Sequence, residues 1–176
     1  FVTLSYDPFE GENRNVDEAR IEGVEAAYEY DAAPWHLRVE AIHQDPRNLS
    51  TDELLYRRAR DSLTVSAQRM FGPLQVGLDV LAAGERKDFG WPEPVTLDSY
   101  VLANLTASWQ VNRSLALVGR VENLLDEQYE LAHTFNTPDR GVYVALRYAP
   151  GVAGATTAAR RDPPSLTAAG AYSAAQ

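Results

Sequence analysis

Apolar and polar residues alternate along most of this chain, and the pattern is clearest between Tyr100 and Pro150. Every second residue is apolar in three successive segments of that stretch. The apolar sets are Val101, Ala103, Leu105, Ala107 and Trp109; then Leu115, Leu117 and Val121; then Val142, Val144, Leu146 and Tyr148. Alternation with period two places one set of side chains on each face of a pleated strand. The stretch therefore predicts three antiparallel strands.

The same alternation recurs four times before Tyr100. The segments run from Arg20 to Tyr30, from Trp35 to Ala41, from Leu55 to Phe71 and from Leu74 to Ala82. A short β-rich stub, Phe1 to Tyr6, precedes them and ends at Asp7-Pro8. We interpret the stub as the last turn or two of a further strand. With it, the chain is expected to hold about eight strands.

The connections between these segments alternate in length. Short turns lie at 31–34, 72–73 and 111–114, whereas long polar connections lie at 7–18, 44–54, 85–98 and 123–140. Outer-membrane barrels have short periplasmic turns at one end and long loops at the other. One strand alone would fit a soluble sandwich equally well, because both architectures alternate. The regular alternation of short and long connections favours an all-β, antiparallel transmembrane barrel segment of the up-and-down type.

Two motifs resemble those of a known family. Asn123-Leu124-Leu125-Asp126-Glu127-Gln128-Tyr129, followed by Asp139-Arg140-Gly141 and a last alternating strand, resembles the end of a TonB-dependent outer-membrane receptor. Upstream, Ala19-Arg20-Ile21-Glu22-Gly23-Val24-Glu25-Ala26 is similar to the same barrel about eight strands from its end, particularly in the cobalamin-transporter branch. The likeness covers residues 1 to about 150. It implies the C-terminal part of a larger barrel in the bacterial outer membrane.

The resemblance also implies partners and ligands. In that family a barrel of ~22 strands encloses a plug, and the periplasmic TonB protein pulls on the plug to admit large, scarce nutrients. A corrinoid is the first expectation for the ligand, and an iron siderophore is the second. We expect the plug and TonB to be partners of the full-length receptor, and lipid to cover the apolar face. Because no export signal precedes Phe1, we expect the chain to begin inside a longer precursor.

Composition narrows the remaining classes. The 176 residues carry a formal net charge of −9 and contain no cysteine, so a nucleic-acid partner and a disulfide framework are both disfavoured. Residues 151–176 are rich in Ala, Gly, Ser and Thr without alternation, which predicts a disordered low-complexity tail after a barrel domain at 1–150. The acidic segment 7–18 does not follow calcium-loop spacing and is expected to be a solvated surface.

The candidate chemistry is sparse, and no catalytic residue, metal ligand or cofactor is predicted. His36, His43 and His133 lie on separate segments, and the first two are seven residues apart on one strand, hence on opposite faces. No hydrolase, phosphate-binding, dinucleotide-binding or metalloprotease motif occurs, so we do not expect an enzyme.

Several polar and aromatic residues have expected roles at the barrel rim and wall. Arg57, Arg58 and Arg60 are expected to pair with loop acids or lipid phosphates in preference to substrate. Phe89 and Trp91 could stack on a ligand or pack their own loop. The segment 123–129 has helical propensity, and Asp126 is expected to cap a turn that folds the last loop onto the rim. The expected polar lumen wall includes Glu25, Glu29, Arg38 and Glu40.

Two alternatives remain open from the sequence. Eight strands suffice to close a small free-standing outer-membrane barrel with a structural or adhesive role. A soluble β-sandwich binding module would show the same alternation.

Overall fold

The computed structural model describes residues 3–7, 12–16 and 18–150, the first two ranges as backbone only, and these residues form strands and loops without a helix. The strands are β1 (Thr3–Asp7), β2 (Glu12–Val16), β3 (Ala19–Ala32), β4 (Trp35–Asn48), β5 (Asp61–Phe71), β6 (Leu74–Ala83), β7 (Arg86–Asp88), β8 (Val95–Leu97), β9 (Tyr100–Asn112), β10 (Leu115–Glu122) and β11 (Gly141–Tyr148). Seven of them form one antiparallel sheet in the order β11-β10-β9-β6-β5-β4-β3. The predicted all-β, antiparallel architecture is confirmed.

Strand register sorts the side chains of this sheet into two chemically different faces. One row of register partners runs Tyr28, Val39, Val65, Val80 and Ala103 from β3 to β9. A row of the opposite parity runs Glu29, Arg38, Ser66, Asp79 and Asn104 across the same strands. Because side chains alternate along each strand, the sheet has a continuous apolar face and a polar face. The faces match the sets that alternation predicted.

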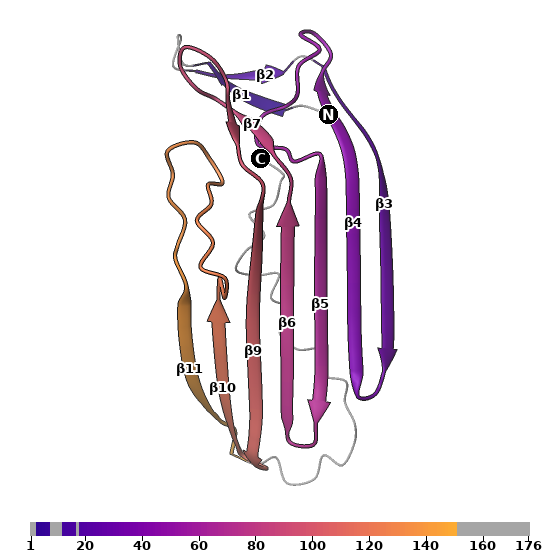
Figure 1. Cartoon of the computed structure of the whole chain (residues 1–176), viewed down its shortest axis with the longest axis vertical. Coiled ribbons are helices and arrows are strands. Elements are labelled where there is room, and N and C mark those ends of the chain that lie inside the picture. Colours follow the sequence, from indigo (N-terminus) through magenta and orange to yellow (C-terminus); the bar gives the residue numbers. More distant parts are fainter. Residues whose placement is uncertain (1–2, 8–11, 17, 151–176) are drawn as a thin grey trace.

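The two ends of the sheet differ as the connection lengths predicted (Figure 1). Tight turns join β3 to β4, β5 to β6 and β9 to β10 at one end. The long connections, with the small sheets β1–β2 and β7–β8, gather at the other end. We call these the short-turn end and the long-loop end. Outer-membrane barrels place their short turns on the periplasmic side.

Three local expectations differ from the structure. The stub at 1–6 does not join the large sheet, because Thr3–Asp7 pairs with Glu12–Val16 in a sheet of its own. The strand expected from Leu55 begins only at Asp61, so the arginines before it lie in a loop. The segment 123–129 forms turns, not a helix, since Asn123 and Asp126 both adopt positive φ values of 49° and 57°. The predicted tail, 151–176, and the side chains of 7–17 lie outside the described residues.

The large sheet is a partial barrel with two open edges. Within the described ranges, β3 and β11 each pair with a single neighbour. β3 and β4 are 14 residues long, and β9 is 13, whereas a spanning strand needs about 9 to 11. Gly23 lets β3 lie close to β4, because a Cβ there would be only 2.3 Å from the carbonyl oxygen of His43. No helix long and apolar enough to cross a membrane occurs between residues 18 and 150.

Candidate functional site

A buried carboxylate fastens three long-loop segments together at the long-loop end. Asp88, at the end of β7, is 1% exposed. Its Oδ1 accepts hydrogen bonds from Arg57 Nε and from the Phe89 amide, both at 2.8 Å, and its Oδ2 accepts one from the His133 amide at 2.6 Å. Arg57 also donates its backbone N–H to the Lys87 carbonyl at 2.7 Å. The connection before β5, the β7–β8 hairpin and the connection after β10 are therefore joined at one point.

A buried arginine makes a second junction between the same hairpin and the last loop. Arg86 is 6% exposed and donates a hydrogen bond to the Glu130 carbonyl oxygen. Its guanidinium carbon lies 4.8 Å from the ring centroid of Tyr100, the first residue of β9. Tyr129 packs against the same tyrosine with ring centroids 4.7 Å apart. Cation–π and ring–ring contacts thus attach the hairpin and the last loop to the first residue of β9.

Asn123 holds the start of the last loop. It is 6% exposed; its side-chain oxygen accepts the Glu127 amide at 2.8 Å and its amide group donates to the Glu127 carbonyl at 2.9 Å. Its backbone N–H donates to Asn104 Oδ1 at 2.9 Å. Asp126 accepts instead from the Arg140 amide at 3.0 Å, which closes the other end of the loop. The loop-folding role predicted for this motif has a structural basis, but Asn123 caps the turn where Asp126 was expected to do so.

Charged and aromatic rows bound the apolar face at both ends. Near the long-loop end, the register partners His43 and Asp61 have the parity of the apolar face, and His43 Nδ1 lies 2.6 Å from Asp61 Oδ1. Near the short-turn end, the register partners are Trp35 and Arg69. Between these rows the apolar face of β4 and β5 carries Leu37, Val39, Ala41, Leu63, Val65 and Ala67. Ionised groups are costly at the centre of a bilayer, so the rows mark the limits of the lipid-facing band.

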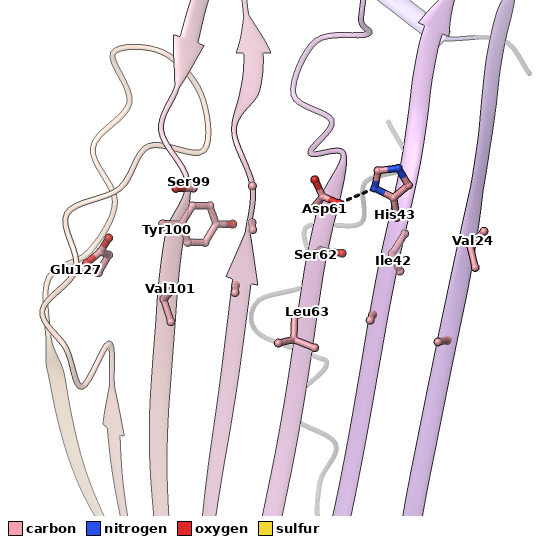
Figure 2. A pocket seen from close by; sticks show the side chains of 15 residues that line it. Val24, Ile42, His43, Asp61, Ser62, Leu63, Ser99, Tyr100, Val101 and Glu127 are labelled. Atoms are coloured by element: carbon pink, nitrogen blue, oxygen red, sulfur yellow. Dashed lines mark hydrogen bonds and ion pairs between the residues drawn. The ribbon is translucent and has the colours of Figure 1, made fainter.

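An open groove lies beside the His43–Asp61 pair (Figure 2). Figure 2 shows this pair at one side of the groove and Tyr100 with Glu127 at the other. Ile42, Ser62 and Leu63 line the groove below the pair, on the same two strands. The groove thus runs from the long-loop end of the sheet to the last long loop.

The structure keeps the three histidines apart, as the sequence predicted. His36 lies on the polar face with its Nδ1 3.9 Å from Asp31, whereas His43 has the parity of the apolar face. His133 contributes its backbone N–H to the Asp88 junction. Within 18–150, no group of three metal-binding side chains comes together.

The structure also shows the contacts of two rim arginines and of the residues expected in the polar wall. Arg57 pairs with Asp88, and Arg60 Nη2 lies 3.5 Å from Asp45, so both contact loop or rim acids. On the polar face Arg38 Nε donates to Glu40 at 2.9 Å and lies opposite Glu29. Of the two loop aromatics, Phe89 is half-buried beside Asp88, whereas Trp91 is 70% exposed.

Asp88 and Arg86 are residues that the sequence reasoning missed. Both lie in the connection 85–98, of which only the two aromatic residues were singled out. The partners that join them to the other two loops, Arg57, Glu130 and His133, are 31 to 45 residues away in sequence, so alternation and local motifs carry no signal for these contacts.

Comparison with known proteins agrees with this geometry. A family model described as "TonB dependent receptor-like, beta-barrel" matches residues 1–124. The vitamin B12 transporter of Vibrio vulnificus is 38% identical over 124 residues, which cover 68% of this chain and 19% of the relative. The vitamin B12 transporter of Photobacterium profundum is 28% identical over 134 residues, covering 76% and 22%. The chain thus spans about a fifth of the length of these relatives.

A solved structure shows the same fold. The ferripyoverdine receptor of the outer membrane of Pseudomonas aeruginosa aligns with a TM-score of 0.65 at 21% identity, over 74% of this chain and 19% of the receptor. The family match covers more than half of the chain, and the open seven-stranded sheet fits as one arc of such a barrel. The chain belongs to the TonB-dependent receptor-like β-barrel family of the bacterial outer membrane.

Proposed function

We propose that residues 1–150 are the C-terminal part of the barrel of a TonB-dependent receptor that imports a corrinoid such as cobalamin, and that 151–176 form a low-complexity tail. The assignment of a corrinoid ligand rests on the 38% identity to a vitamin B12 transporter across the greater part of this barrel segment. The physical support is the division of the sheet into a lipid-compatible face and a polar face. The open edges at β3 and β11 are completed by further strands of the receptor.

The long-loop end supports a role in receiving a large ligand. Asp88, Arg86 and Asn123 hold loops from distant parts of the sequence in one arrangement, and ordered loops lose less conformational entropy when they bind. The polar face supplies the wall of the lumen, and energy coupling requires the plug and TonB as partners. The chain's own residues therefore contribute the wall and part of the mouth.

A chimaeric receptor tests this function. The matching barrel segment of the Vibrio vulnificus vitamin B12 transporter is replaced by residues 1–150, and the chimaera is produced in cells that lack their own B12 transporter. We expect uptake of radiolabelled cyanocobalamin that disappears in cells without TonB. Heat-modifiable mobility and surface labelling report whether the chimaera has assembled.

Two results would refute the corrinoid assignment. The first is an assembled chimaera that takes up no cyanocobalamin. The second is one that restores growth on a ferric siderophore but not on cobalamin, which would make the chain part of an iron-chelate receptor.

A further inference from the structure

Arg69 lies on the apolar face of the sheet, two residues before the end of β5. Its guanidinium carbon is 4.6 Å from the ring centroid of Trp35 and 4.5 Å from that of Phe71. Its Nε is buried without a hydrogen-bond partner, and the two rings are the contacts that the structure records for this side chain within 18–150. An aromatic ring attracts the cation without taking up its N–H donors. The donors that can meet an outside acceptor are therefore the terminal N–H groups of Arg69, whose side chain is partly exposed.

Among the described residues, the neighbours of Arg69 on this face come from β4, β5 and β6. Its strand, β5, lies between β4 and β6, so strands added at the open edges cannot reach it. Its register partners are Trp35 and Val76, and neither can neutralise a positive charge. Since the described neighbours supply no anionic partner, one can come from the medium that covers the apolar face, which in the outer membrane is lipid.

The depth of Arg69 matches that of lipid headgroups. The short-turn end carries a belt of exposed aromatic side chains, namely Trp35 at 44%, Phe71 at 48%, Trp109 at 49% and Tyr148 at 68% exposed. Such belts lie at the membrane–water interface, and short turns lie on the periplasmic side. Arginine presents a planar fork of donors that matches a phosphate group with two parallel hydrogen bonds.

We propose that Trp35, Arg69 and Phe71 form a binding site for the phosphate group of a phospholipid in the periplasmic leaflet. The two rings hold the guanidinium in place, and its N–H groups donate to the phosphate oxygens. The site fastens one lipid to β5, independently of which nutrient the receptor transports.

Solid-state NMR of the receptor carrying this chain tests the proposal. The receptor, labelled with ¹³C at arginine Cζ, is placed in bilayers of phosphatidylethanolamine and phosphatidylglycerol. We expect nearby lipid ³¹P to dephase the ¹³C signal of one arginine in the wild type. The spectrum of Arg69→Gln should lack this dephased signal. Arg113→Gln is the matched control, because Arg113 is exposed in the tight turn between β9 and β10 at the same end; its spectrum should retain the dephased signal.

Native mass spectrometry provides an independent measurement. The wild-type receptor and Arg113→Gln should retain one more phosphatidylglycerol than Arg69→Gln after delipidation. Arg69→Lys keeps the charge but loses the fork, and its lipid retention should weaken by about tenfold, the effect of one charge-assisted hydrogen bond. Dephasing or retention that persists in Arg69→Gln would refute the site. Equal occupancy by inorganic phosphate in a phospholipid-free detergent would show a general anion site and also overturn the proposal.

Discussion

Replacement of Asp88 by Asn tests whether one buried carboxylate holds the long loops together. The amide keeps one oxygen, which can still accept from Arg57 and Phe89. Its NH₂ group then faces the His133 amide, 2.6 Å from the present oxygen, so two donors meet. The loss of one hydrogen bond to a charged acceptor costs about 1.5–3 kcal/mol. The Arg57 ion pair adds little, because that side chain is 58% exposed.

The expected result is local and can be measured by hydrogen exchange. An opening free energy lowered by about 2–3 kcal/mol raises the exchange rate of the His133 amide by about 30- to 150-fold. Mass spectrometry of peptides from 128–137 should show this change in the receptor in nanodiscs, while peptides from β5 remain unchanged. Asp98→Asn is the control, because Asp98 is exposed in the same connection.

Two outcomes would refute this reasoning. Unchanged protection near His133 in Asp88→Asn would show that other contacts hold the loop. Equal loss of protection in Asp98→Asn would show that the loop responds to any change of charge in the hairpin connection.

Three further predictions concern the sheet and its loops. Val65→Arg, in the middle of the apolar face, should lower the free energy of unfolding from lipid vesicles in guanidinium by about 2–4 kcal/mol, whereas Thr64→Arg on the polar face should change it little; equal effects would contradict the assignment of the faces. Asn123→Ala should destabilise by about 1–2 kcal/mol more than Asn123→Gly in the same assay, because only glycine adopts φ 49° freely, and equal losses would exclude backbone strain as the cause. Partial burial of Tyr56, which is 36% exposed, raises its pKa above the ordinary value of 10.0, with smaller contributions from Glu53 and Asp88. The neutral phenol therefore stabilises the loop below pH ~10, and this contribution is lost as pH rises through the raised pKa. The ultraviolet titration difference between wild type and Tyr56→Phe should have its midpoint above pH 10, and a midpoint at or below 10 would contradict the burial.

The sheet could be predicted from the sequence because its signal is local. Alternation along 101–109 or 142–148 identifies each strand and its two faces without knowledge of its neighbours. The folding of the last loop by the 123–129 motif could also be predicted, since Asn123 bonds to Glu127 and Asp126 bonds to Arg140 within that loop. The role of Asp126 was misassigned because a carboxylate and an amide three residues apart offer similar capping chemistry. In the folded loop the Asn123 oxygen accepts the Glu127 amide, whereas Asp126 accepts the more distant Arg140 amide.

The loop junctions could not be predicted in the same way. Asp88 meets Arg57 and His133 only after three connections fold over the end of the sheet, and none of these contacts is periodic. The stub at 1–6 was misplaced for a related reason. A short alternating segment pairs with whichever edge is nearest, and Glu12–Val16 is close in sequence.

The distance between the His43–Asp61 row and the Trp35–Arg69 row sets the bilayer thickness that suits this barrel. From Trp35 to His43 the chain advances eight residues, about 26 Å along the strand at ~3.3 Å per residue, or about 20 Å along the membrane normal at a tilt of ~40°. This is thinner than an average hydrocarbon core of about 30 Å, and bacterial outer membranes are themselves thinner than average. Hydrophobic mismatch should therefore make short-chain lipids the better host for reconstitution, and a thick bilayer would have to thin locally around β4 and β5.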